Sequence, residues 1–205
     1  MARIAVYGGG FDPVHWGHVR PVLAAMETMA LDQVIYLPTA APPHKKGQRF
    51  APASARFTMV ELALLDQPRL RVADFEMRPE ASYTVDTLMH FRQERPDDQL
   101  FLLIGLDAWL ELGGWRRYAE LPELAELVVM ARPGALDGGL DELIGAVPAE
   151  LQNAARRGRV HFVAGPKIEL ASRDLRRAWA AGEEPSAEQV PPLVLDYLRK
   201  YRLYR

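Results

Sequence analysis

The segment at residues 8–18, GGGFDPVHWGH, has residues suited to binding a phosphate. It begins with three glycines and ends with His15 and His18, which are three positions apart. Glycine lets a backbone turn tightly and approach a ligand without a Cβ atom in the way. A helix that starts here would offer unpaired amide groups and the positive end of its dipole to an anion. Two imidazoles beside such amides predict a phosphate site, because a phosphate accepts several hydrogen bonds at once.

Other interpretations of this segment stay open. A strand–glycine–helix turn occurs in many α/β proteins, His18 could simply cap or pack the helix, and a histidine pair could bind a metal. The segment has neither a GxGxxG nor a GxxxxGK[ST] pattern, which excludes the usual dinucleotide and P-loop motifs. Metal binding would need further histidines or carboxylates at fixed spacing, and none stands out. Asp12, beside Pro13, is expected to turn the loop rather than to act in catalysis.

Apolar runs along the chain predict the elements that position these residues. Strands are predicted at residues 3–7, 33–37, 70–75, 99–104, 127–131 and, more weakly, 159–163. Helices are predicted from 18 to about 30, at 52–66, from Ser82 or Thr84 to about 95, at 172–181 and at 193–200. This alternation predicts an α/β fold: a Rossmann-like, doubly wound parallel sheet with helices on both faces. Ligands of such sheets bind beyond the carboxyl ends of the strands, and the polar clusters of this chain follow strands.

Length, composition and charge restrict the class of protein. A chain of 205 residues, 49% hydrophobic, predicts a single domain spanning 1–205. The absence of cysteine excludes disulfides, thiolate metal sites and a cysteine nucleophile. With 25 basic and 27 acidic residues, the net charge of -2 gives no global attraction for nucleic acid. The N-terminal apolar stretch is too short for a signal peptide, and no run approaches the ~20 residues of a membrane span. We therefore expect a soluble, cytoplasmic protein that binds neither nucleic acid nor a membrane.

The segment at residues 8–18 resembles the G-x-F-D-P-x-H-x-G-H signature of nucleotidyltransferases related to class I aminoacyl-tRNA synthetases. Gly10 departs from that pattern, because the family usually carries Ser or Thr there, although the backbone amide is kept. The resemblance implies that His18 contacts the α-phosphate of ATP and stabilises the transition state, while His15 helps to hold the triphosphate. Both are therefore predicted to be catalytic. The other contacts with ATP that this segment predicts are Gly8, Gly9, Gly10 and Phe11.

Four further segments resemble the bacterial nicotinate mononucleotide adenylyltransferases within that superfamily. They are SYTVDT (82–87, family pattern SYT-[IV]-DT), GLDAWLELGGW (105–115, G-x-D-x(6–7)-W), PTAAPPHKK (38–46, P-x-x-x-PPHK) and ARPG (131–134). With the first segment they span residues 4 to 134 in the family's order. Gly105, Asp107 and Arg132 are accordingly predicted to bind ATP. Asp107, just after a strand, could accept from ribose hydroxyls, cap a helix, or do both.

The acceptor, nicotinate mononucleotide, is predicted to bind four residues. His44 and Lys45 lie in a proline-stiffened loop and are expected to contact its 5′-phosphate, whereas Lys46 is expected to be exposed. Thr84 is expected to open a helix whose amides hold the nicotinate carboxylate, with a plain N-cap within residues 82–84 as the alternative. Trp115 follows two glycines and is suited to stack on a flat ring, which the resemblance identifies as the pyridine. Trp109 is expected to pack in the core.

The C-terminal part carries a second predicted phosphate motif. The family's ISST-x-IR segment corresponds to LASRDLR at residues 170–176, in which Ser172 and Arg176 match and Ala171 and Arg173 replace hydroxyl residues. Arg176 is expected to bind the β- and γ-phosphates, and Arg173 to substitute charge for a lost hydroxyl. This motif lies in a helical part at about 166–205. Its last residues, RKYRLYR, are interpreted as a solvated helix end, with a basic-aromatic tail that reaches a partner as the alternative.

The implied reaction is direct in-line attack of nicotinate mononucleotide on ATP, giving deamido-NAD and pyrophosphate in NAD biosynthesis. Mg²⁺ is expected to bridge the triphosphate, held mainly by phosphates and water without dedicated metal ligands of the protein. One alternative is another acceptor, such as nicotinamide mononucleotide. A second is a non-catalytic nucleotide-binding module that has lost activity through Gly10, Ala171 and Arg173. The sequence leaves the oligomeric state open.

Overall fold

The computed structural model describes residues 1–40, 50–78 and 83–204. His44, Lys45, Lys46 and Ser82 therefore lie outside the described residues, and the predictions made for them stay predictions.

Six strands form one parallel sheet in the described chain. They are β1 (Arg3–Gly9), β2 (Gln33–Pro38), β3 (Leu70–Val72), β4 (Gln99–Gly105), β5 (Glu126–Ala131) and β6 (Val160–Ala164). Their order is β3-β2-β1-β4-β5-β6, and every neighbouring pair is parallel. The order reverses between β1 and β4, so the predicted Rossmann-like, doubly wound fold is confirmed.

Helices connect the strands. The α-helices are α1 (Trp16–Thr28), α2 (Ala53–Ala63), α3 (Thr84–Glu94), α4 (Leu106–Leu110), α5 (Leu121–Leu124), α6 (Leu140–Gly145), α7 (Ala149–Arg156), α8 (Ser172–Ala180) and α9 (Pro192–Tyr201). Short 3₁₀ helices are η1 (Phe75–Met77), η2 (Leu112–Gly114) and η3 (Tyr118–Glu120).

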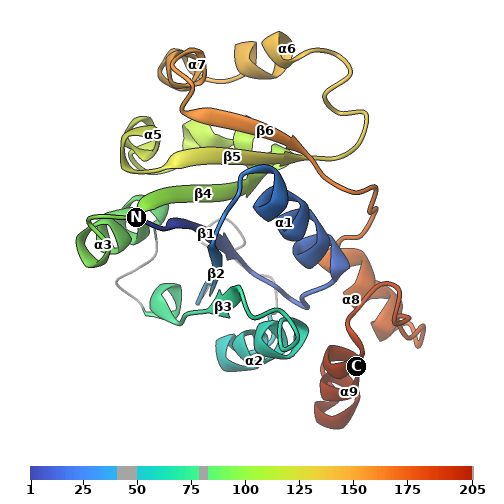
Figure 1. Ribbon diagram of the computed structural model, residues 1–205. Helices are drawn as coiled ribbons and strands as arrows, with labels where there is room; N and C mark the ends of the chain where they lie inside the picture. Colours follow the sequence, from blue (N-terminus) through green and yellow to red (C-terminus); the bar gives the residue numbers. More distant parts are fainter. Residues whose placement is uncertain (41–49, 79–82, 205) are drawn as a thin grey trace.

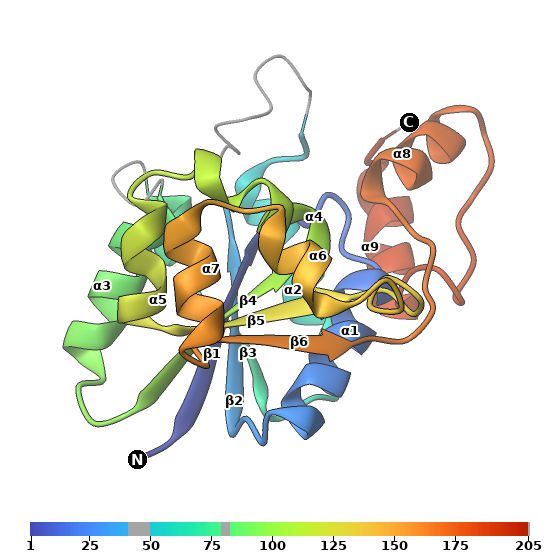
Figure 2. The same ribbon diagram turned by 90° about the horizontal axis from the view of Figure 1, so that it is seen from above.

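The sheet has a hydrophobic core on each face, because successive side chains of a strand point to opposite sides. On β1, Ala5 belongs to one core, together with buried residues of α1, α2, α8 and α9. Ile4 and Val6 belong to the other core, with residues of α3, α5 and α7 and with Trp109, whose predicted core position is confirmed. Figures 1 and 2 show α1, α8 and α9 on one side of the sheet and α3, α5 and α7 on the other.

The predicted elements differ from the structure in two respects. The third strand ends at Val72 instead of residue 75, because this edge strand pairs with β2 alone and then turns into η1 at Phe75. The helices α4 to α7 were not predicted. They have four to eight residues each, which is too short for a helical period to stand out from the sequence.

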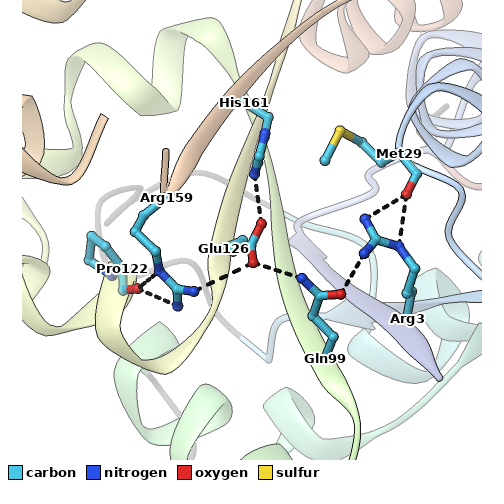
Figure 3. Close-up of polar contacts among 7 residues, drawn as sticks. All are labelled: Arg3, Met29, Gln99, Pro122, Glu126, Arg159 and His161. Atoms are coloured by element: carbon cyan, nitrogen blue, oxygen red, sulfur yellow. Dashed lines mark hydrogen bonds and ion pairs between the residues drawn. The ribbon is translucent and has the colours of Figure 1, made fainter. Parts of the chain in front are cut away.

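A network of polar side chains ties together the first residues of the strands (Figure 3). Glu126, at the start of β5, accepts from Gln99 Nε2 at 2.7 Å and pairs with His161 Nε2 at 2.7 Å. Gln99 in turn accepts from Arg3 Nη1. Arg159 donates to the carbonyl of Pro122 and lies 3.4 Å from Glu126 Oε1, the atom that Gln99 contacts. This network fixes the amino-terminal edge of the sheet, the edge opposite the predicted ligand site.

Among the described residues, no helix combines the length and the apolar character that a membrane span requires.

Candidate functional site

A cleft of about 530 Å³ lies along the carboxyl ends of the strands. Its lining includes Tyr7 of β1, Gly105 of β4, Met130 of β5 and Gly165, just after β6. The cleft also receives side chains from α1 and α8. Seven of the predicted ATP-binding residues line it: His15, His18, Gly105, Asp107, Arg132, Ser172 and Arg176. Its volume suits a nucleotide-sized ligand.

The two histidines cap the start of α1 and contact each other. His15 is the N-cap residue, and its Nδ1 accepts from the backbone amide of Gly17 at 3.1 Å. His18 Nδ1 accepts from the backbone amide of His15 at 3.3 Å, and the two rings lie 3.9 Å apart between centroids. In a neutral imidazole whose Nδ1 accepts, the proton is on Nε2. Both rings are thereby set to donate through Nε2.

This capping corrects one expectation from the sequence. The amides at the start of α1 were predicted to be unpaired and free for an anion. Instead, the amide of Trp16 donates to Gln189 O, and that of His18 donates to His15 O. The amides of His15 and Gly17 bind the two imidazoles, because these rings can do what a serine or aspartate N-cap usually does. The donors that α1 offers to the cleft are therefore imidazole nitrogens.

Glycines in this segment make room for rings. A Cβ atom on Gly17 would lie 2.9 Å from the ring of His15, and one on Gly9 would lie 2.9 Å from the ring of Phe11. Phe11 is buried and meets the ring of His18 edge-on, with 5.2 Å between centroids. Gly8, Gly9, Gly10 and Phe11 are not among the described residues that line the cleft. Phe11 supports the ring of His18, and the predicted contacts of all four residues with ATP stay a prediction.

Arg56 is a buried arginine that was not among the predicted site residues. It is 0% exposed, and its guanidinium donates to the carbonyls of Gly10 (2.7 Å), Thr39 (2.6 Å) and Ala40 (2.8 Å). Nε also donates to Ala51 O at 3.0 Å. One side chain thus ties the glycine loop to the segment after β2. The sequence did carry a signal, since Arg56 has helical spacing with the buried residues Met59, Val60 and Ala63.

Two side chains of α8 hold the loop between β1 and α1. Ser172 Oγ donates to Pro13 O at 3.0 Å, and Arg176 Nη1 donates to Asp12 O at 2.5 Å. Arg176 Nη1 also lies 3.5 Å from Asp12 Oδ2. Asp12 does more than turn the loop, because its buried carboxylate contacts residues from distant segments. The C-terminal motif and the histidine segment therefore meet at one cleft, as the sequence predicted.

The remaining residues of the cleft give it an excess of positive charge. Arg132 and Arg173 are exposed at its edge, and Arg173 lies 3.6 Å from Asp174. Asp107 lies in the first turn of α4, exposed, while Gly105 is the N-cap residue. The alternative role of Asp107 as the N-cap is therefore wrong, because β4 runs directly into α4 at Gly105. Its carboxylate stays available to a ligand.

The predicted acceptor residues lie on a second group of elements. Thr84 is the first residue of α3, and the N-cap residue is Tyr83, which lies within residues 82–84, where the alternative placed a plain N-cap. Trp115 follows η2 and is half-buried against the core around Trp109. The guanidinium of Arg116 lies over the ring of Tyr83, 4.6 Å from its centroid. The segments that carry Thr84 and Trp115 are therefore in contact.

Glu76 is a buried carboxyl group between these two groups of elements. Its Oε1 accepts from Thr87 Oγ1 of α3 at 2.9 Å. Its Oε2 is 3.2 Å from the position that a Cβ atom of Gly8 would occupy. Burial raises the pKa of Glu76 to about 7, although the hydrogen bond from Thr87 taken by itself lowers this pKa. No sequence pattern indicated this residue, since η1 is a single short turn.

The donor set of the cleft bears on how a metal would be held. Among the described residues there is no group of three or more His, Asp or Glu side chains arranged for a metal ion. The described lining of the cleft has one carboxylate, Asp107, and three arginines: Arg132, Arg173 and Arg176. These residues fit a metal that would bind mainly to phosphate oxygens and water.

Comparison with known proteins agrees with this arrangement. The cytidylyltransferase-like family matches residues 6–178. A protein of Symbiobacterium thermophilum named probable nicotinate-nucleotide adenylyltransferase is 38% identical over 205 residues, covering 100% of this chain and 96% of its own. A protein of the same name from Thermus thermophilus is 38% identical over 205 residues, covering 99% of this chain and 100% of its own. The structure of Plasmodium falciparum nicotinic acid mononucleotide adenylyltransferase complexed with NaAD has a TM-score of 0.76, with 18% identity and coverage of 100% and 98%. At that identity the structural likeness concerns the fold.

Proposed function

The chain belongs to the nicotinate-nucleotide adenylyltransferases of the cytidylyltransferase-like family, and from this we propose that it transfers the adenylyl group of ATP to nicotinate mononucleotide. The products are deamido-NAD and pyrophosphate, a step of NAD biosynthesis. The observation that carries the proposal is the shared cleft of His15, His18 and Arg176, at the carboxyl ends of the strands.

The triphosphate would bind between α1 and α8. His15 and His18 donate through Nε2, and Arg176 presents a guanidinium that suits paired phosphate oxygens. Burial lowers the pKa of His15 to about 4, so this ring is neutral near pH 7 and acts as a hydrogen-bond donor instead of a cation. Gly105, Asp107 and Arg132, at the ends of β4 and β5, would hold the nucleoside.

The acceptor would bind beside α3. The first turn of this helix, which starts at Thr84, has amide groups and a dipole that favour a carboxylate. Trp115 would stack on the pyridine ring, and the contact between Arg116 and Tyr83 keeps its segment next to the helix. His44 and Lys45 would contact the 5′-phosphate of the acceptor.

Catalysis would rest on positioning and on neutralising charge. The acceptor phosphate is already a nucleophile near pH 7, so it attacks the α-phosphorus directly, and the bond to the β,γ-pyrophosphate breaks in line without a covalent enzyme intermediate. His18 donates to the charge that develops on the phosphoryl oxygens. Mg²⁺ bound mainly through phosphate oxygens and water would supply further positive charge to the triphosphate. A cytoplasmic location also stays a proposal, which fractionation of cells would test.

Release of pyrophosphate from ATP tests this proposal most directly. The expected result is rapid release with nicotinate mononucleotide and much slower release with its amide, because only the acid offers a carboxylate to the start of α3. Equal rates with the acid and the amide would mean that the enzyme accepts both compounds. Tight ATP binding without pyrophosphate release with either compound would contradict an adenylyltransferase and indicate a nucleotide-binding module.

A further inference from the structure

Tyr204 reaches the loop between β1 and α1 from the segment that follows α9. Its hydroxyl donates to Asp12 Oδ1 at 2.5 Å, a contact between residues 192 positions apart. The amide of Leu203 donates to Leu198 O, so the chain turns back along α9. In Figures 1 and 2 the end of the chain lies beside α8, the helix that carries Arg176. The sequence interpretation of this segment as a solvated helix end was wrong at Tyr204.

The two oxygens of the Asp12 carboxylate have different partners. Asp12 is 2% exposed, and its Oδ1 accepts both from the hydroxyl of Tyr204 and from the backbone amide of Ala51, the latter at 3.1 Å. Its Oδ2 is buried without a hydrogen bond among the described residues and lies 3.5 Å from Arg176 Nη1. A buried carboxylate favours hydrogen-bond donors on both oxygens. The orientation of the Asp12 carboxylate therefore decides whether one or both of its oxygens can pair with the guanidinium of Arg176.

The position of Arg176 depends on that orientation. In the structure its Nη1 donates to the backbone carbonyl of Asp12, and Arg176 is among the residues that line the cleft. A carboxylate free to rotate would draw the guanidinium into a bidentate pair and turn its N–H groups away from the cleft. The two donors on Oδ1 oppose this rotation. Burial raises the pKa of the Tyr204 hydroxyl far above its usual value, with the charge of Asp12 adding to the effect, so the hydroxyl stays a donor.

We propose that Tyr204 is a positioning residue of the nucleotide site: its hydroxyl fixes the carboxylate of Asp12, which keeps Arg176 turned toward the triphosphate. The nature of the ligand rests on the function proposed above. Tyr204 does not line the cleft among the described residues, so it would act only through Asp12 and Arg176.

The Tyr204→Phe variant tests this, because it removes a single oxygen atom. With α,β-methylene ATP and Mg²⁺, calorimetry should give a Kd several-fold and at most about tenfold above that of the wild type, because the lost hydrogen bond affects ATP affinity only through the position of Arg176. The KM for nicotinate mononucleotide should not change. Tyr201→Phe is the matched control, because that ring is 55% exposed and three residues away. Its Kd should equal that of the wild type.

A double-mutant cycle separates positioning from a general structural role. In an Arg176→Ala background, Tyr204→Phe should add nothing to the loss of ATP affinity. An unchanged Kd in the single variant, or the same further loss without Arg176, would overturn the proposal. If Tyr204→Phe yields too little folded protein, Asp12→Asn replaces it. That change keeps Oδ1 as an acceptor but places an amide opposite Arg176, so an unchanged ATP affinity would again overturn the proposal.

Binding of the ATP analogue and release of pyrophosphate are separate measurements. Failure to release pyrophosphate with nicotinate mononucleotide would therefore contradict the proposed function alone, whereas a wild-type protein that does not bind the analogue would contradict both.

Discussion

The rings of His15 and His18 lie 3.9 Å apart, and each accepts a backbone amide hydrogen through Nδ1. These two bonds cap α1 and at the same time set the tautomer of both rings. The Nδ1 atoms that stabilise the helix thus also place the proton of each neutral ring on Nε2, so the same motif serves folding and chemistry.

The His18→Ala variant should lower kcat by about 10²- to 10³-fold, the usual loss when one donor to a transition-state charge is removed. The KM for ATP should rise much less, because the interaction strengthens as charge develops. Steady-state kinetics at saturating acceptor measures both. His90→Ala is the control, since His90 stacks on Phe75 and is not among the described residues that line the cleft. Comparable losses in kcat and in ATP affinity would contradict this role for His18.

The Arg173→Ala variant should raise the Kd for ATP modestly, by about two- to fivefold, because Arg173 is 72% exposed and its charge is screened by solvent. The difference from the wild type should shrink at high salt. Arg177→Ala is a close control: its side chain is 73% exposed and also pairs with Asp174, but it is not among the described residues of the cleft. An ATP affinity that is unchanged in Arg173→Ala would reject the idea that this charge replaces a lost hydroxyl.

The Trp115→Ala variant should raise the KM for nicotinate mononucleotide at least about tenfold, the usual worth of stacking one base on an aromatic ring. The KM for ATP should stay near that of the wild type. Trp115→Phe should restore most of the acceptor affinity, because it keeps a flat ring. If the Phe and Ala variants bind the acceptor equally well, or if both substrates are affected alike, stacking by Trp115 is the wrong explanation.

The sequence predicted the strands well because most of them are buried on both faces. β4 and β5 are nearly continuous apolar runs, a pattern that few other structures produce. The helices α4 to α7 escaped prediction because each is short and is stabilised by what it packs against. Trp109 of α4, for example, is 0% exposed and its indole donates to Leu143 O, a contact that no local pattern could reveal.

The distinction between local sequence patterns and tertiary packing applies to the site as well. The histidine segment and Arg176 were accessible from sequence because motifs give their order along the chain. Tyr204 was not, because its contact with Asp12 joins segments 192 residues apart, and only the packing of α8 and α9 brings them together. The amides of α1 were predicted to be unpaired because histidine is an uncommon N-cap, although a capping role was one of the alternatives for His18 and is found in the structure.

Glu76 should make the folded protein less stable as the pH rises. Its pKa of about 7 in the folded state lies above the usual 4.5, so between these values the folded protein keeps a proton that the unfolded chain has released. The free energy of unfolding should therefore fall by up to roughly 3 kcal/mol from pH 4.5 to 7 through this group and stay level above. Glu76→Gln cannot ionise and should lose this dependence, becoming more stable than the wild type at pH 8.

Urea denaturation at pH 5 and pH 8 measures the effect of Glu76. Glu61→Gln, at an exposed position of α2, should follow the wild type at both pH values. A Glu76→Gln protein whose stability changes with pH as much as that of the wild type would show that this carboxyl group titrates normally.

The polar network at the amino-terminal edge of the sheet, opposite the cleft, should affect stability without affecting catalysis. Burial alone would raise the pKa of Glu126, but hydrogen bonds from His161 and Gln99 and the charges of His161 and Arg159 lower it overall. Its contribution to stability is therefore present above about pH 4.5 and is lost as the pH falls through the lowered pKa. Glu126→Gln should lower the free energy of unfolding by roughly 1–3 kcal/mol at pH 7 and by less at pH 3.5, as measured by urea denaturation.

Glu123→Gln is the control. It breaks a pair with Arg157 in which the two side chains are 63% and 61% exposed, so it should change the free energy of unfolding little. Because Glu126 lies at the start of β5 and the cleft at its end, kcat at 25 °C should be unchanged in both variants, and a loss of kcat in Glu126→Gln alone would show that the two edges are coupled through the sheet.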